Sequence, residues 1–163
     1  MRKLIFVVTL ICTFVIARTQ NLSVEGTAPD LYLNHIVAPK ENFYSVGRLY
    51  NQAPKTIASL NNITMEKGLT VGQHIKIPLN AQNFDVTGNA GSGETLIPIT
   101  HIVAPAETLT KIGSNYNVTP QLVQKWNGLS TDNISPGSPL IVGHLKVKSD
   151  QLQVNNQTNG NPS

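Results

Sequence analysis

Two histidines and two glutamates stand at matching places in this chain of 163 residues. Glu41 follows His35 at the same spacing as Glu107 follows His101. Imidazole and carboxylate groups can bind metals or transfer protons, and two carboxylates about 5–10 Å apart can cleave a glycosidic bond. No partner carboxylate falls at metal-ligand spacing, and the two glutamates lie in different halves of the chain. We therefore expect structural histidines, glutamates that cap a helix or interact with its dipole, and no metal, cofactor or catalytic site.

These pairs belong to a repeat of the surrounding sequence. The letters HIVAP begin at His35 and again at His101, 66 positions later. Further identical pairs follow in the same register, and apolar positions match even where the residues differ, as with Leu60 and Trp126. Identities and an apolar pattern in one register indicate a tandem repeat of one domain. We name residues 34–79 copy one and residues 100–143 copy two.

Each copy carries the same local signals for secondary structure. Pro39 ends a short β-rich stretch, Asn42 suits a helix N-cap, and Pro54 suits the first turn of a second helix. Thr119 is a good cap for the second helix of copy two, whereas Ala53 is a poor one in copy one. The counterparts in copy two are Pro105, Thr108 and Pro120. With a closing strand, the pattern predicts an α+β fold in which two helices cover one face of a two-stranded sheet.

The N-terminus predicts a secretory signal peptide over residues 1–19. Arg2 and Lys3 precede an apolar run from residue 4 to residue 17, which is short for a membrane span of about 20 residues. An uncleaved membrane anchor is the alternative. Cleavage would remove Cys12, the only cysteine, and with it any disulfide or thiol chemistry. We expect a secreted or periplasmic protein at the cell envelope, with no membrane span after cleavage.

The charge balance gives no support for nucleic-acid binding. The chain has 12 basic and 9 acidic residues. Cleavage is expected after Ala17 or just before Gln20. Removal of the signal peptide then takes away Arg2, Lys3 and, in the second case, Arg18. The mature chain would be nearly neutral, whereas phosphate binding depends on clustered Lys and Arg.

The remaining segments are polar. We expect residues 20–33 to be a polar leader, residues 80–99 a flexible linker rich in Gly, Asn, Ser and Thr, and residues 144–163 a disordered tail. The folded part would then be two small units, each with its own core. Tyr50, Tyr116 and Trp126 lie at apolar helix positions, so we expect them to pack in those cores and not to stack on a ligand.

The ordered set of residues in both copies resembles the LysM (lysin motif) domain. Copy one shows it as Val37, Glu41, Phe43, Val46, Gly47, Tyr50, Leu60, Asn61, Leu69, Gly72, Ile75, Ile77 and Pro78. Copy two shows it as Val103, Glu107, Thr108, Leu109, Ile112, Gly113, Tyr116, Asn127, Ile134, Gly137, Leu140 and Val142. The resemblance implies a βααβ domain that binds glycans containing N-acetylglucosamine, such as peptidoglycan or chitin.

The resemblance also implies where the sugar would lie, in a groove between the loop after strand one and the loop after helix two. In copy one these residues are Pro39, Lys40, Glu41, Asn42, Phe43, Asn61, Asn62, Ile63 and Thr64. In copy two they are Pro105, Ala106, Glu107, Thr108, Leu109, Asn127, Gly128, Leu129 and Ser130. The family usually has glycine where Lys40 and Ala106 stand, which predicts a loop less free to adopt positive φ. Copy one also replaces the usual threonine with Asn42, so we expect copy two to be the better binder.

The resulting hypothesis is non-catalytic binding of glycan, peptidoglycan rather than chitin, by two tethered LysM-like domains. No stretch of this chain is long enough to suggest an additional catalytic domain. Two alternatives remain open at this point. One is an envelope scaffold or adaptor that binds a protein partner, and the other is an accessory subunit of a cell-wall hydrolase.

Overall fold

Both copies fold in the predicted order of strand, helix, helix and strand. The structure is a computed structural model that describes residues 22–150. The α+β class and the βααβ order are confirmed. Copy one contains β2 (Tyr32–Ile36), α1 (Phe43–Leu49), α2 (Pro54–Leu60) and β3 (His74–Pro78). Copy two contains β5 (Glu94–Ile102), α3 (Leu109–Tyr116), α4 (Pro120–Asn127) and β6 (Pro139–Lys148), and two further strands are β1 (Leu22–Glu25) and β4 (Phe84–Asp85).

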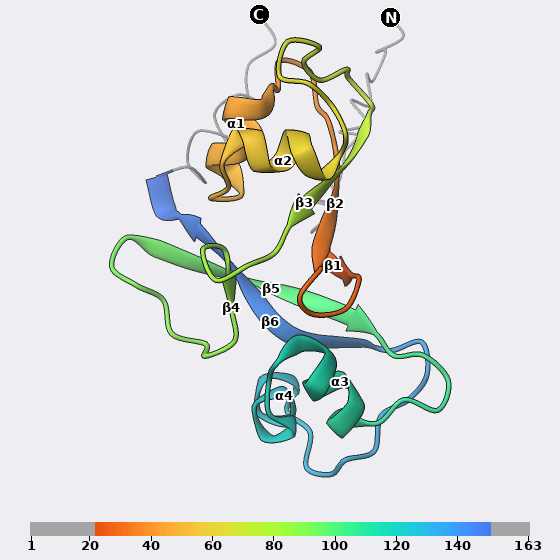
Figure 1. Ribbon diagram of the computed structural model, residues 1–163. Helices are drawn as coiled ribbons and strands as arrows, with labels where there is room; N and C mark the ends of the chain where they lie inside the picture. The colour runs from red at the N-terminus through yellow and green to blue at the C-terminus, as the bar shows by residue number, and fades with distance from the viewer. Residues whose placement is uncertain (1–21, 151–163) are drawn as a thin grey trace, which may run out of the picture.

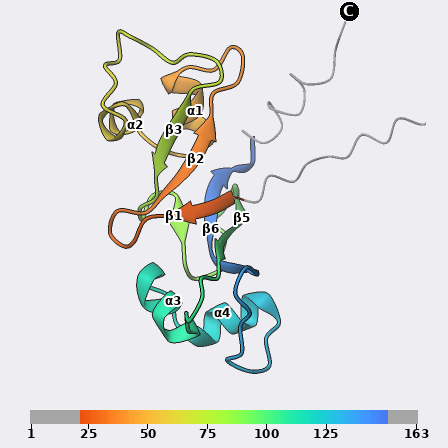
Figure 2. The same ribbon diagram turned by 90° about the vertical axis from the view of Figure 1, so that its right-hand side faces the viewer.

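The two copies share one sheet of six strands in the order β3-β2-β1-β5-β6-β4. Strand β1 joins the copies, because it pairs antiparallel with β2 and parallel with β5. Figure 1 shows the pair α1 and α2 at one end of this sheet and the pair α3 and α4 at the other, and Figure 2 shows the same separation from the side. The copies are therefore connected by backbone pairing as well as by the chain between them.

The segment predicted as a polar leader contributes to the sheet. Residues 22–33 supply β1 and the start of β2. Leu22 and Val24 alternate with polar residues, and Val24 and Leu33 are 5% and 1% exposed. The prediction of a leader is therefore wrong for these residues. The alternation is typical of a strand, but it is too short to stand out from the polar composition around it.

The segment predicted as a flexible linker, residues 80–99, is ordered. It contains β4 and the first part of β5. The Nδ2 group of fully buried Asn83 donates to the carbonyls of Tyr50 and Pro78, each at 3.0 Å. The Asp85 carboxylate accepts bonds from the N–H of Thr87 at 3.1 Å and from the Thr87 hydroxyl at 2.8 Å. The flexible-linker prediction is wrong because the polar side chains here satisfy backbone groups in turns.

The segment predicted as a disordered tail begins within a strand. Strand β6 continues to Lys148, and Leu145 and Val147 on it are only 2% and 1% exposed. The prediction is wrong for residues 144–148, where buried apolar residues alternate with Lys146 and Lys148. Two predictions lie outside the described residues. They are the rest of that tail, beyond residue 150, and the signal peptide at residues 1–19.

The helix ends follow the sequence signals. Asn42 Oδ1 accepts from the N–H of Tyr44 at 2.9 Å and of Ser45 at 3.1 Å. The Asn42 N–H donates to Ser45 Oγ at 2.9 Å, which completes a capping box. Thr119 caps α4 with its side chain, whereas Ala53 gives α2 no side-chain cap. These capping predictions are confirmed.

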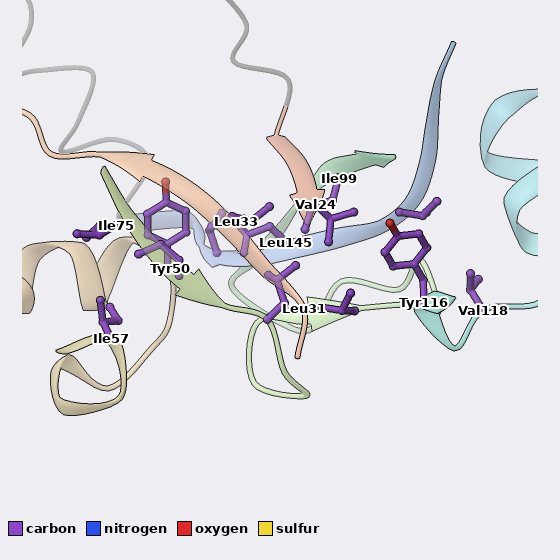
Figure 3. Close-up of a cluster of buried hydrophobic side chains, with 14 of the residues drawn as sticks. Val24, Leu31, Leu33, Tyr50, Ile57, Ile75, Ile99, Tyr116, Val118 and Leu145 are labelled. Atoms are coloured by element: carbon purple, nitrogen blue, oxygen red, sulfur yellow. The ribbon is translucent and has the colours of Figure 1, made fainter. Parts of the chain in front are cut away.

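One hydrophobic core runs through both copies, in place of the two separate cores predicted. Figure 3 shows Leu33 of β2 and Ile99 of β5 in the same cluster, with Val24 and Leu145 near them. All four side chains are at most 5% exposed. Strand β1 and the last part of β6 supply apolar residues that join the two cores. Among residues 22–150, no helix is both long and apolar enough to cross a membrane.

Candidate functional site

Each copy contains a chain of hydrogen bonds from a tyrosine through a histidine to a glutamate. In copy one, His35 Nδ1 lies 3.0 Å from Tyr50 Oη, and His35 Nε2 lies 2.7 Å from Glu41 Oε2. The same carboxylate oxygen accepts the Ala38 N–H at 2.8 Å. Both ring nitrogens of the histidine are thereby engaged, which fixes the ring between the first helix and the loop after β2.

Copy two repeats this chain with nearly the same geometry. His101 Nε2 lies 2.6 Å from Glu107 Oε2, and His101 Nδ1 lies 2.8 Å from Tyr116 Oη. The Ala104 N–H donates to Glu107 Oε2 at 2.7 Å. The expected helix-capping role of the glutamates is wrong, because Asn42 and Thr108 cap the helices. Each glutamate instead joins the loop after the first strand of its copy to the histidine of that strand by hydrogen bonds.

The pKa values of Tyr50, Tyr116 and Glu107 move away from neutrality. Burial, and then the nearby charge of Glu41, raises the pKa of Tyr50 to about 12. Burial and the charge of Glu107 likewise raise the pKa of Tyr116 to about 12. Burial pushes the pKa of Glu107 upward, but the bonds from Ala104 and His101 and the charges of His101 and Lys111 outweigh it and lower that pKa. General acid–base catalysis favours a pKa near the working pH, so these shifts fit a positioning role.

The loop after each first strand is a tight turn. The Glu41 N–H donates to the Ala38 carbonyl at 3.2 Å, with Pro39 second in the turn and Lys40 third at φ 69°. Proline followed by a positive φ is the pattern of a type II turn. Ala106 has φ 63° at the same place in copy two. The loop thus adopts positive φ without the glycine usual in the family, contrary to the restriction that the sequence suggested.

A shallow cavity of about 620 Å³ opens beside this turn in copy two. One wall comes from the start of α3 and the residues before it, and the other comes from the loop between α4 and β6. Its lining consists of Glu107, Thr108, Leu109, Thr110, Asp132, Asn133 and Ile134. We name this cavity the copy-two groove. Its lining combines polar side chains with the apolar Leu109 and Ile134, and such a mixture can bind a polar ligand.

The structure brings some predicted site residues of copy two to this groove and gives others a different role. Glu107, Thr108 and Leu109 line it, and exposed Pro105 and Ala106 form the adjoining turn. Asn127 lies elsewhere, with Nδ2 donating to the Val123 and Ile141 carbonyls and Oδ1 accepting the Ile141 N–H. Gly128 ends α4 at φ 62°, Leu129 packs against the core, and Ser130 is exposed.

The second wall of the groove lies further along the chain than the sequence suggested. Asp132, Asn133 and Ile134 form it, and Thr110 adds to the first wall. Ile134 belongs to the repeated pattern, so its neighbours could have been included. The exposed polar residues Asp132 and Asn133 carry no periodic signal of their own, and only the path of the loop shows where they lie.

The predicted site residues of copy one also divide into exposed residues and residues that hold the fold together. Asn61 ties α2 to β3, since its Oδ1 accepts the Lys76 N–H at 2.7 Å and its Nδ2 donates to the Ile57 and Lys76 carbonyls. Asn62 takes φ 54° where copy two has Gly128. Phe43 is buried, Ile63 packs against the core, and Pro39, Lys40, Asn42 and Thr64 are exposed.

Trp126 packs where the apolar pattern predicted. It lies against the common core, with its ring centroid 5.0 Å from that of His144 in an edge-on arrangement. The backbone of Gly88 covers it so closely that a Cβ there would lie 3.1 Å from Trp126 Nε1. The predicted packing of Trp126 against the core is therefore confirmed. Within residues 22–150, no group of three or more His, Cys, Asp or Glu side chains is placed to hold a metal ion.

A pair of βααβ units, each with loops beside the first helix, defines a class of small binding module. The sequence profile of the LysM domain matches residues 35–78 and 101–143, which together are more than half of the chain. The chain belongs to the LysM domain family, and the resemblance drawn from the sequence is confirmed.

Two curated relatives are both N-acetylmuramoyl-L-alanine amidase sle1. The protein from Staphylococcus saprophyticus is 30% identical over 145 residues, which cover 87% of this chain and 39% of the relative. The protein from Staphylococcus aureus is 24% identical over 145 residues, which cover 86% of this chain and 42% of the relative. The chain thus spans about two fifths of the length of these relatives.

Two solved structures also match in part. The spore cortex-lytic enzyme SleL of Bacillus cereus is 21% identical with a TM-score of 0.33, and 68% of this chain aligns with 22% of that one. The SleL of Bacillus megaterium is 19% identical with a TM-score of 0.29 at the same coverage. At these TM-scores the matches add nothing to the family assignment.

Proposed function

We propose that this protein binds peptidoglycan without cleaving it, at the cell envelope, through the N-acetylglucosamine units of the glycan. The copy-two groove is the observation that carries the proposal, because it lies in a LysM domain between the two loops nearest the expected sugar site. An N-acetyl group presents a methyl, an N–H and a carbonyl, all uncharged. Loop backbone, hydroxyl groups and apolar side chains such as Leu109 and Ile134 can bind these groups.

Peptidoglycan is proposed over chitin because of the relatives. Both are named as amidases of N-acetylmuramoyl-L-alanine, a linkage that belongs to peptidoglycan. The predicted signal peptide supports a location outside the membrane. Since both copies belong to one sheet, two sites would be held at a fixed separation, and a repeating polymer could engage both with a raised effective concentration.

A pull-down with purified insoluble peptidoglycan, compared with chitin, tests the proposal. We expect the chain to be retained on peptidoglycan more strongly than on chitin, with no release of peptides or sugars from the polymer. Stronger retention on chitin would reverse the choice of glycan. Retention on neither polymer would favour a scaffold that binds protein, and release of fragments would show that the chain is catalytic.

The proposed ranking of the two copies needs variants of the whole chain, because the copies share a sheet and a core. Thr110 and Asn133 of copy two correspond to Tyr44 and Lys67 of copy one. Thr110→Tyr with Asn133→Lys gives copy two the residues of copy one, and Tyr44→Thr with Lys67→Asn does the reverse. We expect the first pair to weaken binding of a chito-oligosaccharide about fivefold and the second pair to leave it unchanged or stronger. If both pairs of substitutions changed the affinity equally, the result would contradict the proposal that copy two is the better binder.

A further inference from the structure

A second kind of hollow occurs at the same place in both copies, beside the turn that joins the two helices. In copy one its lining includes Tyr44, Gly47, Arg48, Asn51, Gln52, Ala53 and Pro54. In copy two its lining is Thr110, Gly113, Ser114, Asn117, Val118, Thr119 and Pro120. Each of these residues is the repeat counterpart of the one at the same place in the other list. We name them the copy-one notch and the copy-two notch.

The two notches differ in size and in what closes them. The copy-one notch has a volume of about 660 Å³, and the copy-two notch about 320 Å³. The additional wall of the copy-one notch comes from Ala81, Gln82 and the end of β6, with Lys146, Lys148 and Asp150. Figures 1 and 2 both show this end of β6 beside α1. The additional wall of the copy-one notch is therefore formed in part by a strand of copy two that reaches the helices of copy one.

The notches also differ in charge. Arg48 of the copy-one notch stands where the copy-two notch has Ser114, and Lys146 and Lys148 are added by β6. Asp150 is the one acidic residue in this lining. Within residues 22–150, the side chains of Arg48 and Lys148 form no hydrogen bond or ion pair. The copy-one notch thus presents an excess of positive charge, whereas the copy-two notch has no charged residue.

The walls of the copy-one notch are held in place. The Gln52 and Asn80 amides donate to each other in both directions at 3.1 Å. Asn51 Nδ2 donates to the Gln82 carbonyl at 2.9 Å, and Lys146 Nζ donates to the Ala81 carbonyl at 2.8 Å. A ligand would therefore meet an ordered surface and would not have to order the loop on binding.

We propose that the copy-one notch binds a carboxylate of the peptides attached to peptidoglycan, with Arg48 and Lys148 as its charged contacts. Arg48 offers a planar guanidinium suited to two parallel bonds with a carboxylate. Exposed Tyr44 and the amide groups of the wall offer further surface to the peptide backbone. This inference rests on the proposed function, since it assumes that the glycan bound is the peptide-bearing one.

The test measures binding of the full chain to two soluble probes, a disaccharide that carries its peptide and a chito-oligosaccharide that carries none. Arg48→Gln and Lys148→Gln are the variants, singly and together. Lys55→Gln is the control, because it removes a positive charge from α2 outside the notch. We expect about a threefold loss of affinity for the peptide-bearing probe from each change, as for exposed ion pairs, and about a tenfold loss from both. The affinity for the chito-oligosaccharide should stay unchanged.

Added salt should weaken binding of the peptide-bearing probe and reduce the difference between the variants and the original chain. Suppose that the double variant binds the chito-oligosaccharide normally and the peptide-bearing probe with unchanged affinity. That result would overturn this inference and leave the proposed function standing. An effect of the double variant on binding of inorganic phosphate but not of the peptide-bearing probe would also overturn it. Failure of the original chain to bind either probe would instead overturn the proposed function.

Discussion

The two copies are most alike in the residues that hold the fold and least alike in the residues around their hollows. Both have the tyrosine–histidine–glutamate chain, the turn with a positive φ, and the asparagine that ties the second helix to the last strand. The copies differ in their surface residues and in the chain segments that pack against them. Copy one has the charged notch beside Arg48, and copy two has the polar groove beside Thr108.

The segments outside the repeat increase this difference. Gln52 of copy one pairs with Asn80 of the connecting segment, whereas its counterpart in copy two is the buried Val118. The N–H of Ala28, from the segment before the repeat, donates to the Asn115 carbonyl of copy two at 3.2 Å. Each helix pair is thus held by a segment that the other copy lacks. The comparison indicates that a duplicated fold can acquire two different sites through its neighbours as well as through its own substitutions.

The largest expected effect concerns the glycines where the helices of each copy meet. A Cβ at Gly47 would lie 2.6 Å from the Gln52 carbonyl oxygen, and one at Gly113 would lie 2.5 Å from that of Val118. Gly47→Ala and Gly113→Ala should each lower the free energy of unfolding by about 2–3 kcal/mol, because backbone must move to relieve the clash. Urea unfolding followed by circular dichroism measures the loss.

The same experiment tests whether the copies unfold together. Trp126 lies in copy two, so its fluorescence reports on that copy. Since the copies share one core, Gly47→Ala in copy one should shift the fluorescence midpoint as much as the dichroism midpoint. A fluorescence midpoint that does not move would show that the copies unfold separately. Lys55→Ala, on the exposed face of α2, is the control and should change stability by less than about 0.5 kcal/mol.

A smaller effect is expected at the buried tyrosines. Tyr50→Phe and Tyr116→Phe each remove a hydrogen bond to a histidine, and each should cost about 1 kcal/mol of stability at neutral pH. Equal losses would support equivalent networks in the two copies. A loss in one copy alone would show that its partner histidine does not need the tyrosine.

The same tyrosines predict a dependence on high pH. Burial, and then the charge of the neighbouring glutamate, raises the pKa of both tyrosines to about 12 in the folded protein, whereas a tyrosine in an unfolded chain ionises near pH 10. The folded protein therefore keeps protons that the unfolded chain loses, so the free energy of unfolding should fall from about pH 10 to about pH 12. The double Phe variant should show a flatter fall.

The smallest effect concerns the second helix of each copy. Thr119 Oγ1 caps α4 by accepting the Leu122 N–H at 3.3 Å, whereas Ala53 offers α2 no such bond. Thr119→Ala should destabilise the protein by about 1 kcal/mol, and Ala53→Thr should stabilise it by about 0.5–1 kcal/mol. Urea midpoints of the two variants measure both changes. A destabilising Ala53→Thr would mean that the wall of the copy-one notch does not accept the larger side chain.

The sequence predicted well those features that depend on residues close together in the chain. The caps at Asn42, Thr108 and Thr119 and the prolines at the helix starts follow from local hydrogen bonding and backbone geometry. The packing of Trp126 follows from its place in an apolar pattern shared by both copies. The sequence also predicted two residues of the copy-two groove, Glu107 and Thr108, because they adjoin a predicted helix end.

Composition was a poor guide to the segments between and beside the copies. Asn83 and Asp85 look like linker residues, yet their side chains satisfy backbone groups that only the folded chain brings near them. The role of Glu107 was also misjudged, because its bond to His101 joins a loop to a strand and has no local signal. Asp132 and Asn133 were missed as groove residues for the same reason.

The sequence by itself determined that there are two βααβ domains of the LysM family, because the repeat, the caps and the apolar spacing act within short stretches of chain. The tertiary structure decided that these domains share one sheet and one core. It did so because β1 pairs on one side with β2, its neighbour in sequence, and on the other side with β5, which is distant in sequence. It also decided that Lys146 and Lys148 lie beside Arg48, since only the path of β6 brings these charges to the helices of copy one.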